Sequence, residues 1–138
     1  MATNPPITIG PFANVPAPGS GVKSDWAQQI TNYVLRGAWT PVTFQNGWVN
    51  FAAGSNACQY RKEGDRVFLR GMMKSGTLGN VIAFALPAGF RPPADVYLAT
   101  VSNALFGYCN ILAADGGFRP QAVNASWVSI ECSFSTVT

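Results

Sequence analysis

The chain has 138 residues, of which 48% are hydrophobic and 11% charged, and its formal net charge is +3. This length allows one domain with a modest core, and the scattered basic residues form no run that would indicate a nucleic-acid partner. Histidine is absent, which removes the commonest general base and the commonest metal ligand together.

Residues 1–23 are predicted to form an extended arm. Prolines recur here too often for a helix or a central strand. They stand at Pro5, Pro6, Pro11, Pro16 and Pro18. Apolar residues between them, such as Phe12 and Val15, make the segment too apolar for a simple solvated linker. We expect the arm to lie in a groove on a partner or a neighbouring subunit; the alternative is a disordered tail.

Segment 24–37 is predicted to contain one short helix, from Ser24 to Arg36, with Gly37 after its end. Ser24 or Asp25 can cap its start. Its apolar residues fall at i, i+4, i+7 and i+8 and form one stripe. They are Trp26, Ile30, Tyr33 and Val34. About three turns are too few for stability in water, so the helix must pack on something, either in a bundle around a symmetry axis or against its own domain.

From residue 38 to 138 the pattern changes to short strands separated by turn residues. We expect strands near 39–44, 48–51, 57–61, 66–73, 80–84, 96–101, 106–113, 118–121 and 127–135. Asn46-Gly47 has the composition of a two-residue hairpin turn, and Asp115-Gly116 is similar. Roughly eight or nine strands about ten residues apart are typical of a β-sandwich, here jelly-roll-like. The predicted fold is mainly β, with an N-terminal arm and one helix.

One stretch organises the predicted sheet, namely Tyr60-Arg-Lys-Glu-Gly-Asp-Arg-Val-Phe-Leu-Arg-Gly71. Two strand-like runs flank the charged turn Glu63-Gly64-Asp65, and a turn of this kind sets the register of the strands paired to it. The pattern predicts a scaffold hairpin whose charged tip is solvated.

The cysteines favour a reduced protein without a disulfide framework. Cys58, Cys109 and Cys132 lie far apart, their number is odd and no CxxC spacing occurs, so we expect buried free thiols.

Met1 is followed by Pro-rich polar sequence and not by a signal peptide. The longest apolar run, 81–86, is too short to cross a bilayer. We therefore expect synthesis in a cytoplasm and no membrane insertion.

The sequence contains no arrangement that is typical of a catalytic site. Its lysines belong to no Ser–Lys motif, and most of its carboxylates fall at a helix cap or in turns. The strand pattern leaves the orientation of Glu131 open, and neither a phosphate loop nor a Ca²⁺ loop is present. We expect a non-enzyme with no cofactor, no metal and no catalytic residues.

Aromatic residues are the remaining signal. Those in strand-like runs are expected to fill the core, as aromatic pairs do between β layers. They are Trp39, Trp48, Trp127, Phe44, Phe51 and Phe134. Tyr97, Phe106 and Tyr108 have two interpretations: they pack in the core as well, or they line a surface cleft that stacks on sugar rings.

Two parts of the sequence resemble known phage proteins. The arm Phe12-Ala-Asn-Val-Pro-Ala-Pro-Gly19 and the helix start Ser24-Asp-Trp-Ala-Gln-Gln-Ile30 resemble the opening of minor tail proteins of tailed phages that infect actinobacteria. A second group of motifs is similar to the distal β-domain of phage tail fibres and baseplate proteins. It comprises Trp39-Thr-Pro-Val42, Asn46-Gly-Trp48, Tyr60-Arg-Lys-Glu-Gly-Asp-Arg-Val67, Leu69-Arg-Gly71 and Leu86-Pro-Ala-Gly-Phe-Arg-Pro92.

The resemblance implies a virion structural protein, a homotrimer whose arm and helix anchor it to other virion proteins. The anchoring residues would be Phe12, Val15, Pro16, Trp26, Ile30, Tyr33 and Val34. The β-domain would then face outward and bind a host-surface glycan during adsorption, as a receptor-binding tail component. No long fibrous shaft separates helix and β-domain, so a capsid decoration protein that stabilises the phage head through its arm is the alternative.

Overall fold

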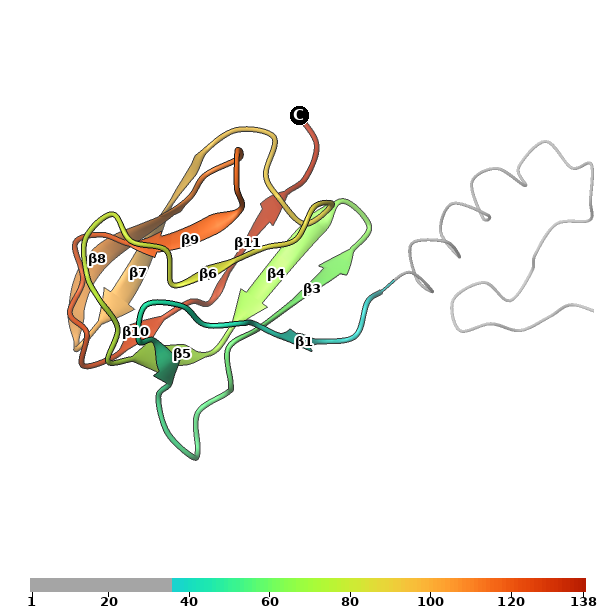
Figure 1. Cartoon of the computed structure of the whole chain (residues 1–138). Coiled ribbons are helices and arrows are strands. Elements are labelled where there is room, and N and C mark those ends of the chain that lie inside the picture. The colour runs from blue at the N-terminus through green and yellow to red at the C-terminus, as the bar shows by residue number, and fades with distance from the viewer. Residues whose placement is uncertain (1–35) are drawn as a thin grey trace, which may run out of the picture. The chain divides into compact units, whose positions relative to one another are not determined.

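The computed structural model describes residues 36–138, and from Gly37 onward they form one compact unit (Figure 1). The predicted arm (1–23) and the predicted helix in segment 24–37, apart from its last two positions, lie outside the described residues. Between residues 36 and 138 the chain forms eleven strands and no helix. This range therefore contains no helix that could cross a membrane.

The strands are short and belong to two sheets (Figure 1). Their bounds are β1 Thr40–Pro41, β2 Val49–Asn50, β3 Gln59–Glu63, β4 Arg66–Arg70, β5 Met72–Lys74, β6 Phe84–Ala85, β7 Val96–Ser102, β8 Leu105–Ile111, β9 Gly117–Pro120, β10 Val128–Ser129 and β11 Cys132–Ser135. One sheet has four strands in the order β1-β3-β4-β11, and the other has seven in the order β2-β5-β10-β7-β8-β9-β6. The larger sheet curls into half a barrel, and the expected two-sheet β architecture is confirmed.

Two of the predicted strands are each divided between the two sheets. The predicted strand 66–73 separates into β4 and β5, and the predicted strand 127–135 separates into β10 and β11. β4 pairs with β11 in the smaller sheet, whereas β5 pairs with β10 in the larger one. The segments 66–74 and 128–135 thus pass from one sheet to the other side by side. We call the place where they pass the shared corner.

Gly71 and Glu131 build this corner. Gly71 has φ +120°, and a Cβ at this position would lie 2.5 Å from the carbonyl oxygen of Ala57, so only glycine fits without a shift. Ile130 donates its backbone N–H to the Gly71 carbonyl at 3.0 Å. The Gly71 N–H donates in turn to Glu131 Oε2 at 2.6 Å. In an unbroken strand, a backbone carbonyl of the neighbouring strand would accept the hydrogen bond from this N–H. Here the Glu131 carboxylate accepts it instead.

The hairpin predicted from the charged turn is confirmed. β3 and β4 pair antiparallel from Gln59 opposite Arg70 to Glu63 opposite Arg66, and Gly64 in the turn has φ 59°. Asn46-Gly47 also forms a turn with positive φ at both residues, but the strands on either side of it do not pair with each other. β1 pairs with β3 and β2 pairs with β5, so this turn moves the chain from one sheet to the other.

The core lies between the sheets and is continuous. Its buried apolar residues are Trp48, Cys58, Val67, Leu69, Met73, Ala83, Phe84, Leu86, Cys109, Ile111, Phe118, Val128, Ile130 and Phe134. The rings of Phe84 and Phe118 stack with centroids 4.8 Å apart, on strands that pair directly. Such stacked pairs add specific contact to the burial of apolar area.

The aromatic residues expected in the core differ in how deeply they are buried. Trp48 and Phe134 are buried, and Phe44 packs against the core from a half-buried position. Phe51 and Trp127 are half-buried, and their ring centroids lie 6.4 Å apart. For Trp39 the expectation is wrong: its ring lies beneath the guanidinium groups of arginines that project from the outer face of the smaller sheet.

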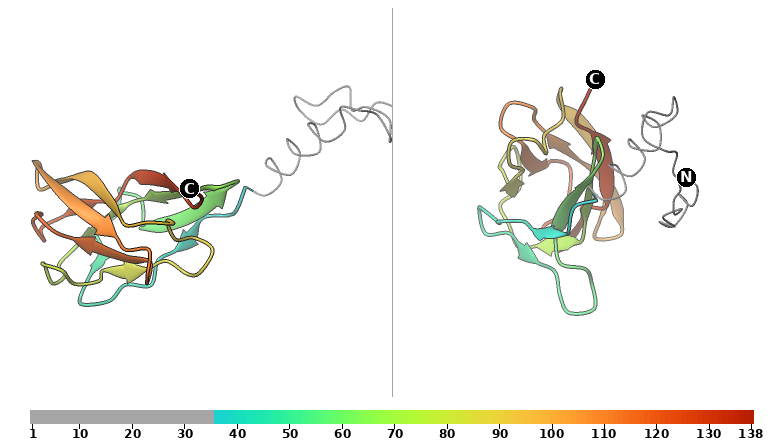
Figure 2. Two further views of the ribbon diagram at one scale, coloured as in Figure 1. Left: turned by 90° about the horizontal axis from the view of Figure 1, so that it is seen from above. Right: turned by 90° about the vertical axis from the view of Figure 1, so that its right-hand side faces the viewer.

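The domain has two distinct ends. Gly37 donates its N–H to the Lys62 carbonyl at 2.8 Å, so the chain enters beside the turn between β3 and β4. The turn between β7 and β8 lies at the far end (Figures 1 and 2). We call these the proximal end and the distal end.

Candidate functional site

The outer face of the β7–β8 hairpin exposes an unusual number of large apolar side chains. Tyr97 is 69% exposed, Phe106 92% and Tyr108 43%. Val101 and Leu105 on the same hairpin are exposed as well. Single exposed apolar residues are common on protein surfaces, but a contiguous group of them is typical of an interaction site.

Strand pairing explains why these side chains gather. Residues directly opposite one another in paired strands project from the same face of the sheet. Val101 is opposite Phe106, and Ala99 is opposite Tyr108. Tyr97 lies diagonally from Tyr108, and their ring centroids are 6.3 Å apart. The three aromatic rings therefore share one outer face, which we call the aromatic face.

The turn that closes this hairpin holds its backbone in an uncommon conformation. Asn103 has φ 47° and Ala104 has φ 64°, so both central residues are left-handed. Asparagine tolerates this region, but for alanine it is a strained conformation that costs roughly 1 kcal/mol. The turn follows the twist of the two strands and brings Leu105 and Phe106 to the distal end.

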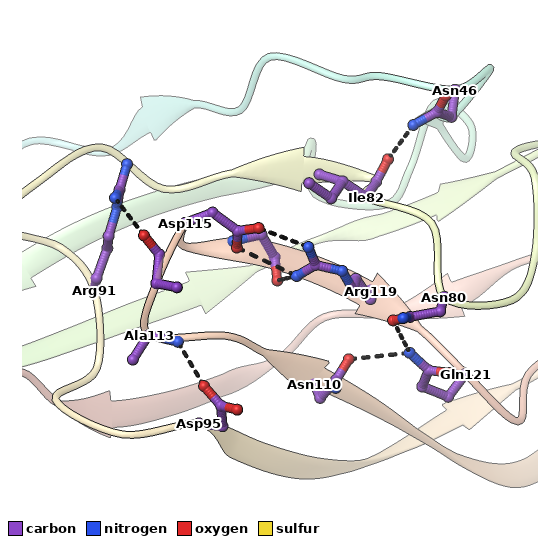
Figure 3. Close-up of polar contacts among 12 residues, drawn as sticks. Asn46, Asn80, Ile82, Arg91, Asp95, Asn110, Ala113, Asp115, Arg119 and Gln121 are labelled. Atoms are coloured by element: carbon purple, nitrogen blue, oxygen red, sulfur yellow. Dashed lines mark hydrogen bonds and ion pairs between the residues drawn. The ribbon is translucent and has the colours of Figure 1, made fainter.

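Three amide side chains form a cluster (Figure 3), and strand pairing places this cluster next to the aromatic face. Asn110 is opposite Tyr97 on β8 and is buried. Gln121 follows β9 and donates through Nε2 to Asn110 Oδ1 at 3.1 Å and to Asn80 Oδ1 at 3.2 Å. Its backbone N–H bonds to the Tyr108 carbonyl, which places Gln121 beside that tyrosine. Aromatic rings and amide groups thus lie next to each other on one surface.

Beyond the amides lies an ion pair that fixes the β8–β9 connection (Figure 3). Arg119 is 7% exposed and bonds to Asp115 Oδ2 at 2.7 Å and to the Gly117 carbonyl at 3.0 Å. The hydrogen bond from Arg119 and that from the Gly117 N–H hold the pKa of Asp115 below its ordinary value. This pair has a structural role, since it closes the loop that places β9 beside β8 in the sheet.

The remaining carboxylates near this surface also bond to the backbone. Asp95 Oδ1 accepts from the Ala113 N–H at 2.8 Å, and Glu131 Oε2 accepts from the Gly71 N–H at the corner between the sheets. Within residues 36–138, no group of three His, Cys, Asp or Glu residues could hold a metal ion. A cavity of about 10 Å³ lies beneath β7 and β8, which is room for a single water molecule at most.

The expected thiols are confirmed as free, with Cys58 and Cys109 buried and Cys132 half-buried. Burial is the main cause that raises the pKa of each thiol to about 12. They are neutral near pH 7 and therefore poor nucleophiles.

The sequence-predicted site residues divide into two groups. Tyr97, Phe106 and Tyr108 lie together on one exposed face, so their interpretation as core residues is wrong, and ligand contact stays a prediction. The expected anchoring residues all lie outside the described residues. They are Phe12, Val15, Pro16, Trp26, Ile30, Tyr33 and Val34.

Sequence reasoning missed the amide cluster and the two apolar residues at the hairpin tip. The amides come from three separate segments, at Asn80, Asn110 and Gln121, so no local motif links them. Leu105 and Val101 continue an apolar pattern that looks like a core strand. A signal was available in the Asn103-Ala104 pair, because asparagine at a strand end favours a tight turn and hence an exposed tip.

The arrangement is suited to binding a ligand that has both apolar and hydroxyl-bearing surfaces. Tyrosine rings offer apolar faces, and neither the Tyr97 nor the Tyr108 hydroxyl makes a hydrogen bond within the described part of the chain. Of the amide groups beside them, those of the exposed Asn80 and the half-buried Gln121 can donate to hydroxyls and accept from them. A sugar ring combines these two kinds of surface.

Comparison with known proteins identifies the fold. No protein-family model matches the chain, and no curated protein matches its sequence. Among solved structures, the chain is similar to the crystal structure of the receptor binding protein (gp15) of Listeria phage PSA, with a TM-score of 0.59. The match covers 91% of this chain and 83% of that chain, at 15% sequence identity. At this identity the likeness shows a shared fold.

Proposed function

We propose that the chain is a tail-associated adsorption protein of a phage, which acts as a homotrimer and binds a host-surface glycan through the aromatic face. The observation that carries the proposal is the aromatic face itself, formed by Tyr97, Phe106 and Tyr108 on the β7–β8 hairpin. The fold shared with a phage receptor binding protein supports the same function.

The location of the hairpin also supports adsorption. The chain enters at the proximal end beside Lys62, and the hairpin tip with Phe106 lies at the distal end. A domain tethered through its N-terminal segment would therefore present its aromatic tip away from the attachment point. The proposal includes a non-catalytic role, because the described carboxylates around the site are engaged in backbone bonds and an ion pair.

Alanine substitutions on the aromatic face test this function. Phe106→Ala and Tyr97→Ala should each weaken binding of the labelled protein to host cells or to purified wall polysaccharide about tenfold, since each removes one stacking contact. Both side chains are mostly exposed, so the variants should fold normally. Val137→Ala is the matched control, because Val137 is an exposed apolar residue outside this face.

Three outcomes would count against the proposal. Undiminished binding by both variants would show that the aromatic face does not contact the receptor. A change in the sedimentation of Phe106→Ala would show instead that the face is a contact between subunits. Immunolabelling of phage particles on the head, and not on the tail, would favour capsid decoration.

A further inference from the structure

The outer face of the four-stranded sheet differs in character from the aromatic face. Side chains alternate along β4, so Val67 and Leu69 point into the core while Arg66, Phe68 and Arg70 point outward. Arg61 on β3 is opposite Phe68 and shares this outer face. We call Arg61, Arg66, Arg70, Trp39 and Phe68 the basic face.

The guanidinium groups of this face are held in place by rings and by polar neighbours. Arg70 lies over the Trp39 ring at 4.1 Å and donates twice to Gln59 Oε1. Arg61 lies over the same ring at 4.8 Å and over the Phe68 ring at 5.8 Å. Stacking of this kind keeps a guanidinium in one orientation, which lowers the entropy lost when it binds an anion.

The positive charge of the basic face is not balanced by its own carboxylates. Glu63 is the one acidic residue in the strand positions of β3, β4 and β11, and it pairs with Arg61 at 3.3 Å. Arg66 bonds to Ser133 Oγ at 3.0 Å, and neither Arg66 nor Arg70 forms an ion pair with another described residue. The Nε atom of Arg61 is buried and has no hydrogen-bond partner among residues 36–138.

We propose that the basic face binds an extended, acidic segment of a partner protein. Arg66 and Arg70 are four residues apart on β4, and Arg61 of β3 lies beside Phe68 midway between them, so three cationic positions follow one another at steps of about 7 Å along the strand direction. An extended peptide places alternate side chains on one side at the same spacing. Carboxylates at alternate residues would therefore meet successive guanidinium groups, which bind them through paired N–H donors.

The location of the face indicates which kind of partner it meets. The basic face lies on the sheet beside which Gly37 enters, and the aromatic face lies on the other sheet. If the chain acts in adsorption as proposed, the proximal end faces the particle, so the partner is a virion protein and not a host polymer. This last step alone depends on the proposed function; the charge complementarity does not.

A binding experiment on the full chain tests whether the basic face binds an acidic peptide or a different polyanion. The probes are an acetylated peptide of alternating Glu and Thr, the same peptide with Gln in place of Glu, and sodium polyphosphate, each titrated calorimetrically at low ionic strength. We expect the Glu peptide to bind and the Gln peptide not to bind, with affinity falling as salt is added. Arg66→Glu should weaken binding of the Glu peptide roughly tenfold, because it replaces attraction by repulsion.

Lys74→Glu is the matched control, since it makes the same charge change on β5 of the other sheet. It should alter the affinity less than about twofold. Equal losses in the two variants would overturn the proposal, because binding would then follow net charge alone. Tighter binding of polyphosphate would overturn it in favour of a phosphate polymer, and no binding of the Glu peptide would overturn it outright. If Arg66→Glu lowers the melting temperature, Arg66→Gln takes its place in the titration.

Discussion

At the scale of single residues, burial determines the chemistry of the thiols. Cys58, Cys109 and Cys132 each have a pKa raised to about 12, chiefly because burial penalises the thiolate. Their folded-state pKa values therefore lie above the ordinary value of 9.0. The neutral thiols stabilise the fold below pH 9, and this contribution is lost as the pH rises from 9 towards 12.

The raised thiol pKa values predict that the free energy of unfolding depends measurably on pH. Cys58→Ala removes one such group, so its free energy of unfolding should fall less steeply above pH 9 than that of the unmodified protein. The difference in slope should approach about 1.4 kcal/mol per pH unit. Urea unfolding at pH 8, 9 and 10 measures it. The comparison uses only the difference between the two proteins, and parallel curves would contradict the prediction.

Two arginines show that residue type alone does not assign a role. Arg119 is buried against Asp115 and stabilises a loop, whereas Arg66 is exposed on the basic face. Both follow strand-like patterns in the sequence. What separates them is a carboxylate four residues away that folds back onto Arg119, and the loop geometry that permits this is tertiary.

At the scale of elements, the shared corner between the sheets is the feature on which the fold depends. β4 and β5, like β10 and β11, are adjacent in sequence but pair in different sheets. The break occurs where Gly71 adopts positive φ and where its N–H turns to the Glu131 carboxylate. A side chain at Gly71 would collide with the Ala57 backbone and force the corner open.

A pair of glycine substitutions tests the corner. Gly71→Ala should lower the free energy of unfolding by about 3 kcal/mol, because it adds a backbone collision to the cost of positive φ. Gly54→Ala is the control: Gly54 has φ +96°, but no atom of the described part of the chain lies within 4 Å of a Cβ built there, so only the conformational cost of about 1 kcal/mol remains. Chemical denaturation measures both, and equal losses would show that the contact with Ala57 is unimportant.

The β7–β8 hairpin shows what strand periodicity can and cannot provide. β7 places Val96 and Leu98 against the core and exposes Tyr97 and Val101 on the opposite face. Because both alternating sets are apolar, the sequence predicts the strand but not which set is buried. That choice follows from the partner strand and from the sheet that packs behind it.

At the scale of the whole molecule, the domain presents an aromatic face on one sheet and a basic face on the other. This separation fits a protein that contacts two different partners. Residues 37–138 form a compact unit with their own continuous core, so they should fold without the preceding segment. For the proposed trimer, in contrast, we expect the contacts to come from the helix predicted in segment 24–37.

Truncation therefore separates folding from assembly. A protein of residues 37–138 should give the same cooperative unfolding transition as the full chain but should sediment as a monomer, because the predicted apolar helix stripe is missing. The full chain should sediment at three times 14.7 kDa. Sedimentation equilibrium of the two proteins checks this. A monomeric full chain would remove the trimer from the proposal, and a trimeric truncated chain would place the contacts in the β-domain.

The sequence by itself determined the local features of this protein. Strand segments, the charged turn after β3 and the free thiols were all predictable, because alternation, turn composition and cysteine spacing act over a few neighbouring residues. The sheet to which each half of a divided strand belongs was decided only in the tertiary structure, as was the exposure of Tyr97, Phe106 and Tyr108. The physical reason is that strand pairing and burial depend on segments far apart in the chain, such as Gly71 meeting Glu131 and Tyr97 meeting Asn110.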